Sequence, residues 1–342
     1  MKLGNRLLRT ALTVSLCGAS VGAQEPHRHE GQAPEIGRVK FAISCGPSAR
    51  QRFNRAVAWL HSFEYDRAEA EFVAAAESDP ACAMCYWGIA MSSYHPLWAP
   101  PGSGELKKGA VATEKARSIG AKTRRENDYI AAIATFYKDY DRLDYYSRAL
   151  AYEQAMAHVF HRYPKDREAA VFYALSLNAT AMATVPPDKS YAKQKKAAAI
   201  LNTVLREQPR HPGVAHYLIH SYDYPQLASL ALAAARSYAG IAPDSAHALH
   251  MPSHIFTRLG LWQESIKSNV ASEASAKRHA EQARLSGAWD EQLHAMDYLM
   301  YAYLQGGQHE KAVLVLDELR GITKTEPENF KVAYAFAAVP AR

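Results

Sequence analysis

The feature that most constrains this chain is a repeated spacing between histidines. His216 and His250 lie 34 residues apart, and the same interval separates His220 from His254. A period of this length is typical of a two-helix unit that stacks on copies of itself. Residues one period apart occupy equivalent positions on neighbouring units, so the two pairs should face each other across a helix–helix contact. The spacing therefore predicts an all-α array that grows by adding units, without one central core.

A second repeat signature lies near the start of the array. Ala68 and Phe72 stand four residues apart and are followed by Ala75 and Pro80, which matches the second half of the tetratricopeptide (TPR) consensus. The chain thus resembles the TPR superfamily, specifically exported bacterial TPR proteins with a histidine-rich groove. The resemblance implies a right-handed superhelix of antiparallel helix pairs, whose first helices line a concave groove, the usual ligand surface. The pattern recurs less completely near residues 197–209, 232–243, 260–265 and 306–316.

The segment before the array is expected to be a signal peptide followed by a leader. Within residues 1–23, basic residues precede a short apolar run, and small residues occupy the place where a peptidase cuts. This pattern predicts export to the periplasm or secretion. Residues 24–46 contain glycine and proline and are expected to form a flexible leader. Residues 47–342 should be the TPR-like domain, with insertions near 95–103, 180–194 and 276–289.

Charge and hydropathy exclude two classes of partner. The formal net charge is +6 for the whole chain, and three of the basic residues belong to the signal segment, so the mature chain carries about +3. Its basic residues alternate with acidic ones, which disfavours a nucleic-acid partner. No apolar stretch after the signal is long enough to cross a bilayer, so no membrane insertion of the mature chain is expected.

Three cysteines remain after the signal: Cys45, Cys82 and Cys85. An oxidising compartment permits a disulfide. Cys45 and Cys82 each precede or open a helix in adjacent units, so we expect a bridge between them, with Cys85 as the alternative partner of Cys45.

The histidines form rows on successive first helices. His216, His220 and Asp223 stand at i, i+4 and i+7, and their directions fall within a stripe about 60° wide. One unit later, His247, His250 and His254 form a second row at i, i+3 and i+7, again within a stripe about 60° wide. In the third unit, aligned on its glycines and alanine, the corresponding residues are His294, Asp297 and Tyr301.

This constellation favours a transition-metal site. Neighbouring helix axes pack about 8–10 Å apart, a distance that imidazoles from both sides can bridge onto one ion. A nitrogen-rich set suits copper, zinc or iron better than magnesium or calcium. The expected ligands are His216, His220, His247, His250, His254, His294 and Asp297; the residues expected to support them or to contact a substrate are Asp223, Arg258, Tyr301 and His95. A metal-free polar groove and purely structural histidines remain open alternatives.

The sequence leaves catalysis undecided. It contains no HExxH zinc motif, no haem-attachment motif and no phosphate-binding loop. One interpretation is an oxidative or hydrolytic metalloenzyme acting on a small molecule or peptide in the concave groove. The other is a non-catalytic scaffold that binds peptides or partner proteins there.

Overall fold

The computed structural model describes residues 33–342, and residues 35–342 form a compact unit. The predicted signal peptide and residues 24–32 of the predicted leader lie outside the described residues. The elements are, in order, α1 (Pro47–His61), α2 (Tyr65–Ser78), α3 (Ala83–Ser92), α4 (Ser103–Ile119), α5 (Arg124–Tyr137), α6 (Tyr145–Arg162), α7 (Arg167–Ala183), α8 (Ala192–Glu207), α9 (Pro212–Tyr222), the 3₁₀ turn η1 (Ala228–Ala231), α10 (Leu232–Ile241), α11 (Ala246–His250), α12 (Pro252–Arg258), α13 (Trp262–Ala283), β1 (Ala288–Trp289), α14 (Asp290–Gln305), α15 (His309–Gly321), β2 (Thr325–Glu326) and α16 (Phe330–Ala341).

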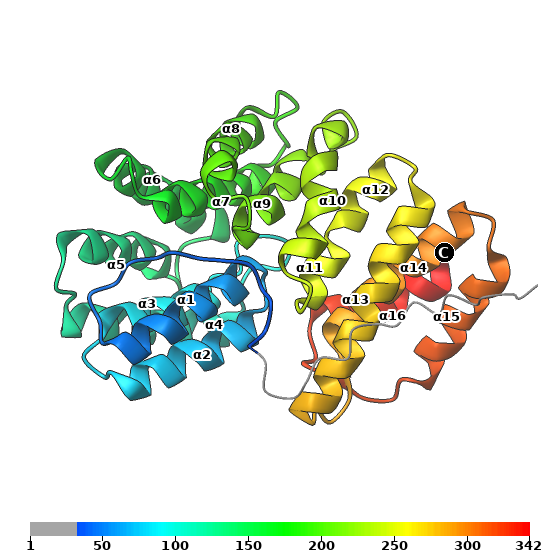
Figure 1. The fold of residues 1–342 in the computed structure, drawn as a ribbon, viewed down its shortest axis with the longest axis horizontal. Coiled ribbons are helices and arrows are strands. Elements are labelled where there is room, and N and C mark those ends of the chain that lie inside the picture. The colour runs from blue at the N-terminus through cyan, green and yellow to red at the C-terminus, as the bar shows by residue number, and fades with distance from the viewer. Residues whose placement is uncertain (1–32) are drawn as a thin grey trace, which may run out of the picture. The chain divides into compact units, whose positions relative to one another are not determined.

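The helices follow one another as packed pairs (Figure 1). Within several pairs the first helix packs on its partner and also contacts the first helix of the next pair, as α1 does with α3 and α7 with α9. The two-residue strands β1 and β2 pair with each other in parallel. The expectation of an all-α array of sequentially packed helix pairs is confirmed.

The apolar interior is divided along the array. One cluster joins the helices from α1 to α9, another surrounds α9 to α12, and a third lies among α13 to α16. Small alanines such as Ala68, Ala75 and Ala235 are fully buried at these contacts and allow the helices to approach closely. This division is what a stack of repeated units produces, because each unit buries its apolar face against its neighbours.

Residues 35–46 are not a flexible leader but part of the packed unit. Ile36, Phe41 and Ile43 are buried, and the backbone amide of Phe41 donates to Asn54 Oδ1 over 2.7 Å. The Phe41 ring enters the largest apolar cluster and contacts aromatic residues of α1, α3, α5 and α7. The segment forms neither helix nor strand, and its glycine and proline content concealed an apolar stretch that packs against the array.

A disulfide joins this segment to the array. Cys45 and Cys82 are bonded as expected from the sequence, with their Cα atoms 5.3 Å apart. Cys85 is buried, and desolvation raises the pKa of its thiol to about 12.

The three expected insertions take different forms. Residues 93–102 form an irregular loop, and residues 184–191 form another between α7 and α8. In the third, α13 continues as a helix to Ala283, so only residues 284–289 leave the regular pattern.

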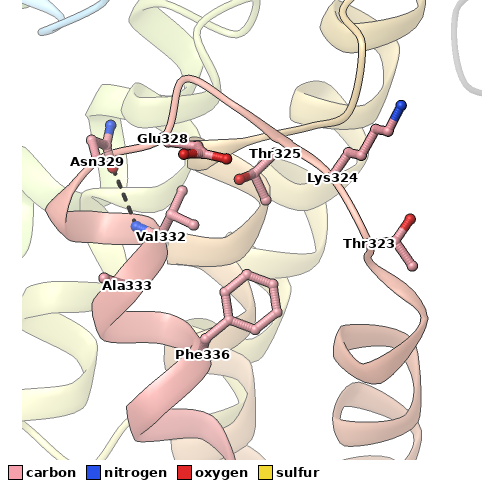
Figure 2. Close-up of a pocket in the computed structure, with 8 residues that line it drawn as sticks. All are labelled: Thr323, Lys324, Thr325, Glu328, Asn329, Val332, Ala333 and Phe336. Carbon is pink, nitrogen blue, oxygen red and sulfur yellow. Dashed lines mark hydrogen bonds between the residues drawn. The ribbon is translucent and has the colours of Figure 1, made fainter.

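Two further features bear on binding. Among residues 33–342, none of the helices combines the length and apolar character needed to span a bilayer. A pocket of about 330 Å³ lies at the start of α16 (Figure 2). It is lined by Thr323, Lys324, Thr325, Glu328, Asn329, Val332, Ala333 and Phe336, none of which belongs to the predicted site.

One long-range contact determines how the histidine-bearing helices are covered. Helix α1 packs against α9, although more than 150 residues separate His61 from Tyr217, whose side chains are hydrogen-bonded. The turn between α1 and α2 therefore lies over the predicted histidine row. Instead of lining an open groove, most of these histidines are buried.

Candidate metal centre

A first histidine group (His216, His220, His247) forms between α9 and α11. Pro212 begins α9, and His216 and His220 follow one turn apart on one face. Their Nε2 atoms are 3.0 Å apart, and the ring of His247 lies 5.0 Å from that of His216 between ring centres. One nitrogen from each ring can therefore meet at a common point, with all three within 4.8 Å of one another.

A second histidine group (His250, His254, His294) forms among α11, α12 and α14. Pro252 divides what would be one helix into α11 and α12, yet His250 and His254 still share a face, with their Nε2 atoms 3.0 Å apart. The ring of His294 lies 4.2 Å from that of His250. These three also bring ligand atoms within 4.8 Å of one another.

The two groups adjoin each other. Ring centres lie 6.0 Å apart between His247 and His250, and 6.2 Å apart between His220 and His254. The structure thus brings together all six histidines that the spacing singled out. His294 alone among them is partly exposed, and the other five are buried.

Each of four rings is held from its Nδ1 side by an acceptor on another element. His216 Nδ1 donates to the backbone carbonyl of His61 over 2.6 Å. The others face side-chain oxygens: His250 Nδ1 lies 2.6 Å from Asn269 Oδ1, His254 Nδ1 lies 2.8 Å from Asp223 Oδ2, and His247 Nδ1 lies 3.3 Å from Glu291 Oε2. An outer acceptor of this kind fixes the tautomer and turns the opposite nitrogen toward the centre.

These hydrogen bonds determine which ring nitrogens of His250 and His254 carry a proton. The Asn269 amide nitrogen donates to the Ser265 carbonyl over 2.9 Å, so its oxygen must face His250 and accept from Nδ1. Asp223 is ionised: burial opposes its charge, but His254 and Arg258 lower its pKa to about 2. His254 Nδ1 therefore also carries a proton. In neutral rings, both Nε2 atoms then present lone pairs to each other.

Burial keeps most of these rings neutral. Desolvation, reinforced by neighbouring histidines, lowers the pKa of His216, His220 and His250 well below the usual value. Desolvation also lowers the pKa of His294, to about 3. Neutral imidazole is the form that binds metals.

Two of the expected residues on α14, Asp297 and Tyr301, do not contact the histidine groups. Asp297 belongs to neither histidine group, and its carboxylate is held by Arg342 at 2.8 and 3.1 Å. The ring of Tyr301 packs beside Trp262 and under the Arg342 guanidinium.

The face of α14 that meets the histidines carries Glu291, His294 and Tyr298. Glu291 contacts His247, and the Tyr298 ring lies 4.7 Å from that of His250. On a helix, Glu291 and Tyr298 are rotated to one side of His294, whereas Asp297 is rotated about 60° to the other. The alignment of the third unit on its glycines therefore predicted that the Asp297 side of α14 faces the histidines, whereas the side with Glu291 and Tyr298 does.

Two of the remaining expected residues, Asp223 and Arg258, support the second histidine group. Asp223 joins His254 to Arg258, whose Nε lies 2.9 Å from Asp223 Oδ1. His95 is in neither group; it stacks on Tyr65 at 4.2 Å and faces Glu105 at 3.3 Å.

Two aromatic residues cover the centre from loops. The Phe63 ring, in the α1–α2 turn, lies 4.4 Å from His216 and also contacts the rings of His220 and His247. Trp98, in the 93–102 loop, lies 5.9 Å from His294 and 6.1 Å from His254. No pattern in the sequence indicates that the turn containing Phe63 reaches α9, because only tertiary packing brings the two together.

A further buried set lies behind the first group. His61 Nε2 and His211 Nε2 each lie 2.9 Å from a Glu168 carboxylate oxygen, and the Tyr217 hydroxyl donates to His61 Nδ1 over 2.9 Å. Burial opposes the Glu168 charge, but the two histidines lower its pKa. Although these ligand atoms also lie within 4.8 Å of one another, the rings act as donors to the carboxylate. The set fixes His61, whose carbonyl holds His216.

Comparisons with known proteins add little. No family model matches the chain, and no curated protein matches it. Among solved structures, a crystal structure of the P58(IPK) TPR domain is similar, with a TM-score of 0.26 and 11% sequence identity, covering 86% of this chain and 88% of that chain. A similarity this low supports no functional conclusion, so function rests on the chain's own side chains.

Proposed function

We propose that this protein binds a transition metal ion through its buried histidines, with the second histidine group as the primary site. The observation that carries the proposal is the approach of His250 Nε2 and His254 Nε2 to 3.0 Å. Both rings donate through Nδ1 to acceptors, so two lone pairs face each other. A metal ion between them would accept both lone pairs and so offset their repulsion.

The geometry of the pair suits a metal ion. Metal–nitrogen bonds of about 2.0–2.1 Å at a tetrahedral ion separate two ligand nitrogens by roughly 3.3 Å. The observed separation of 3.0 Å therefore needs an adjustment of a few tenths of an ångström. His294 supplies a third nitrogen, which leaves a fourth position for a small molecule.

The ligand chemistry narrows the choice of metal. The group offers imidazole nitrogens without thiolate or carboxylate, which suits copper, zinc or iron rather than magnesium or calcium. Asp223 and Asn269 support the ligands from behind, and such outer partners raise ligand basicity and hold the rings in place.

The proposal extends to location and partner. The signal-like segment at residues 1–23 supports a periplasmic or secreted protein. A small molecule at the open coordination position is the expected ligand. Burial of His216 and His250 argues against the alternative in which this row forms an open groove for peptides.

Metal retention tests the proposal. We would strip the untagged protein with a chelator, offer copper, zinc or iron(II), desalt it and measure bound metal by mass spectrometry. The wild type should retain at least one ion per chain. His250→Ala and His254→Ala should each weaken binding by more than about 100-fold, beyond the 10–100-fold typical of outer partners.

A matched control is available in His279, which contacts Arg67 and Trp289 and belongs to neither group. His279→Ala should bind metal as the wild type does. The proposal fails if the wild type retains no metal above background, or if the control loses as much as the two variants.

A further inference from the structure

We infer that the first histidine group holds a second metal ion, and that the two groups form one paired centre that takes a small oxygen-donor ligand between the ions. This inference rests on the proposed function, because it adds an ion beside the one proposed for the second group. It is carried by separate observations on His216, His220 and His247.

The clearest of these observations is an unpartnered nitrogen. His247 Nε2 is buried and has no hydrogen-bond partner, while Nδ1 of the same ring faces Glu291. Glu291 is held as a carboxylate by Lys331, whose Nζ donates to Glu291 Oε1 over 2.5 Å. A neutral His247 ring therefore carries its proton on Nδ1, which leaves a lone pair on the unpartnered Nε2. Leaving such a buried atom without a partner destabilises the fold, and ligation of a metal removes this cost.

His216 contributes a second lone pair to the same place. Its Nδ1 must donate to the His61 carbonyl, which can only accept, so Nε2 has no proton. His220 Nε2 lies 3.0 Å from it, and the three rings share Phe63 as a common neighbour. Three nitrogens with at least two fixed lone pairs therefore converge in a buried space.

Helix α11 links the two groups into one centre. It contributes His247 to the first group and His250 to the second, three residues apart on adjoining faces. The distance between ring centres is 6.0 Å from His247 to His250 and 6.2 Å from His220 to His254, so the two groups lie next to each other. Ions that act as a pair in enzymes lie about 3.5–4 Å apart, within reach of one bridging atom.

The charge of the paired centre indicates that the ligand between the two ions is an anion. Both groups supply imidazoles, which carry no negative charge, and the two carboxylates that contact them, Asp223 and Glu291, occupy the Nδ1 sides of His254 and His247. Two divalent ions would leave a positive charge in a buried site, which is costly without an anion. A hydroxide, or another small oxygen ligand of negative charge, fits between the ions.

Access to the pair is one-sided. Phe63 covers the first group, whereas the second group is bordered by Trp98, which is 50% exposed, and by the partly exposed His294 and Tyr298. An external ligand would therefore enter past Trp98 and reach the ion of the second group first.

Copper loading tests the paired centre. We would titrate metal-free protein with Cu(II), measure copper per chain and compare total copper with the spin seen by electron paramagnetic resonance. Two ions per chain with a signal well below total copper are expected, because an oxygen bridge couples the two unpaired electrons. His216→Ala should retain one ion, visible at full intensity. His247→Asn, which keeps a polar group beside Glu291, should do the same if the alanine variant folds poorly.

The outcomes separate the two proposals. One ion per wild-type chain, or two ions at full spin intensity, would overturn the paired centre and leave the single site standing. No bound copper, zinc or iron would overturn both. His279→Ala serves as the control and should match the wild type in stoichiometry and in signal.

Discussion

At the scale of single residues, the arrangement depends on what each imidazole does with its second nitrogen. His250 and His254 point their Nε2 atoms inward only because Asn269 and Asp223 accept from Nδ1. Asp223 follows from the sequence because it shares a helical stripe with His216. Asn269 does not, because it lies on α13 and belongs to no row of histidines.

Two aspartates, the half-buried Asp223 and the buried Asp297, provide a sharp test of these roles. Asp223 and Asp297 are each held by an arginine, but only Asp223 touches a histidine of the centre. Asp223→Asn should weaken metal binding about 10–100-fold, because it removes the charge that supports the His254 proton. Asp297→Asn should leave affinity unchanged. Isothermal titration with zinc measures both, and equal losses would show that Asp297 belongs to the site.

At the scale of elements, the sequence predicts the repeated helices but not the contacts between segments that are far apart in the chain. The 34-residue period brings the histidines of α9, α11 and α12 together, because neighbouring units repeat one geometry. It fails on α14, where an insertion precedes the helix and the alignment cannot fix which side of His294 turns inward. Phe63 and residues 35–46 escape prediction because their contacts join segments far apart in sequence.

The contact between α1 and α9 can be tested with two glycines. A Cβ on Gly213 would lie 2.6 Å from His61 Nδ1, whereas one on Gly240 meets nothing within 4 Å. Gly213→Ala should lower the free energy of unfolding by about 1–3 kcal/mol, because it overpacks the buried His61. Gly240→Ala should be neutral or raise it by up to about 1 kcal/mol through helix propensity. Urea unfolding measures both, and stabilisation by Gly213→Ala would contradict the packing described here.

At the scale of the whole molecule, the array accommodates a buried polar centre because its apolar core is divided. The helices that carry the histidines contribute their apolar residues to separate clusters, around α9 to α12 and around α13 to α16, so stacking of the units holds the rings in place. The fold class and the six histidines were therefore predictable, whereas burial of the row and its aromatic covers required the tertiary structure.

Burial of so many neutral histidines predicts a characteristic pH dependence for the metal-free protein. The pKa values of His216, His220 and His250 are lowered well below 6.5, and that of His294 is lowered to about 3. On unfolding, each ring regains a pKa near 6.5. Below that pH the unfolded chain binds more protons than the folded one, so the free energy of unfolding falls as pH falls.

The loss should begin near pH 6.5 and steepen toward the lowered folded values. Each histidine contributes a slope approaching about 1.4 kcal/mol per pH unit. Urea unfolding at pH 7.5, 6.5 and 5.5, in the presence of a chelator, measures the slope. His250→Asn should reduce proton uptake on unfolding at pH 5.5 by about one proton. A stability that stays constant between pH 7.5 and 5.5 would mean that these rings are already charged or solvated in the fold, and the neutral, inward-facing lone pairs on which the metal centre depends would then be absent.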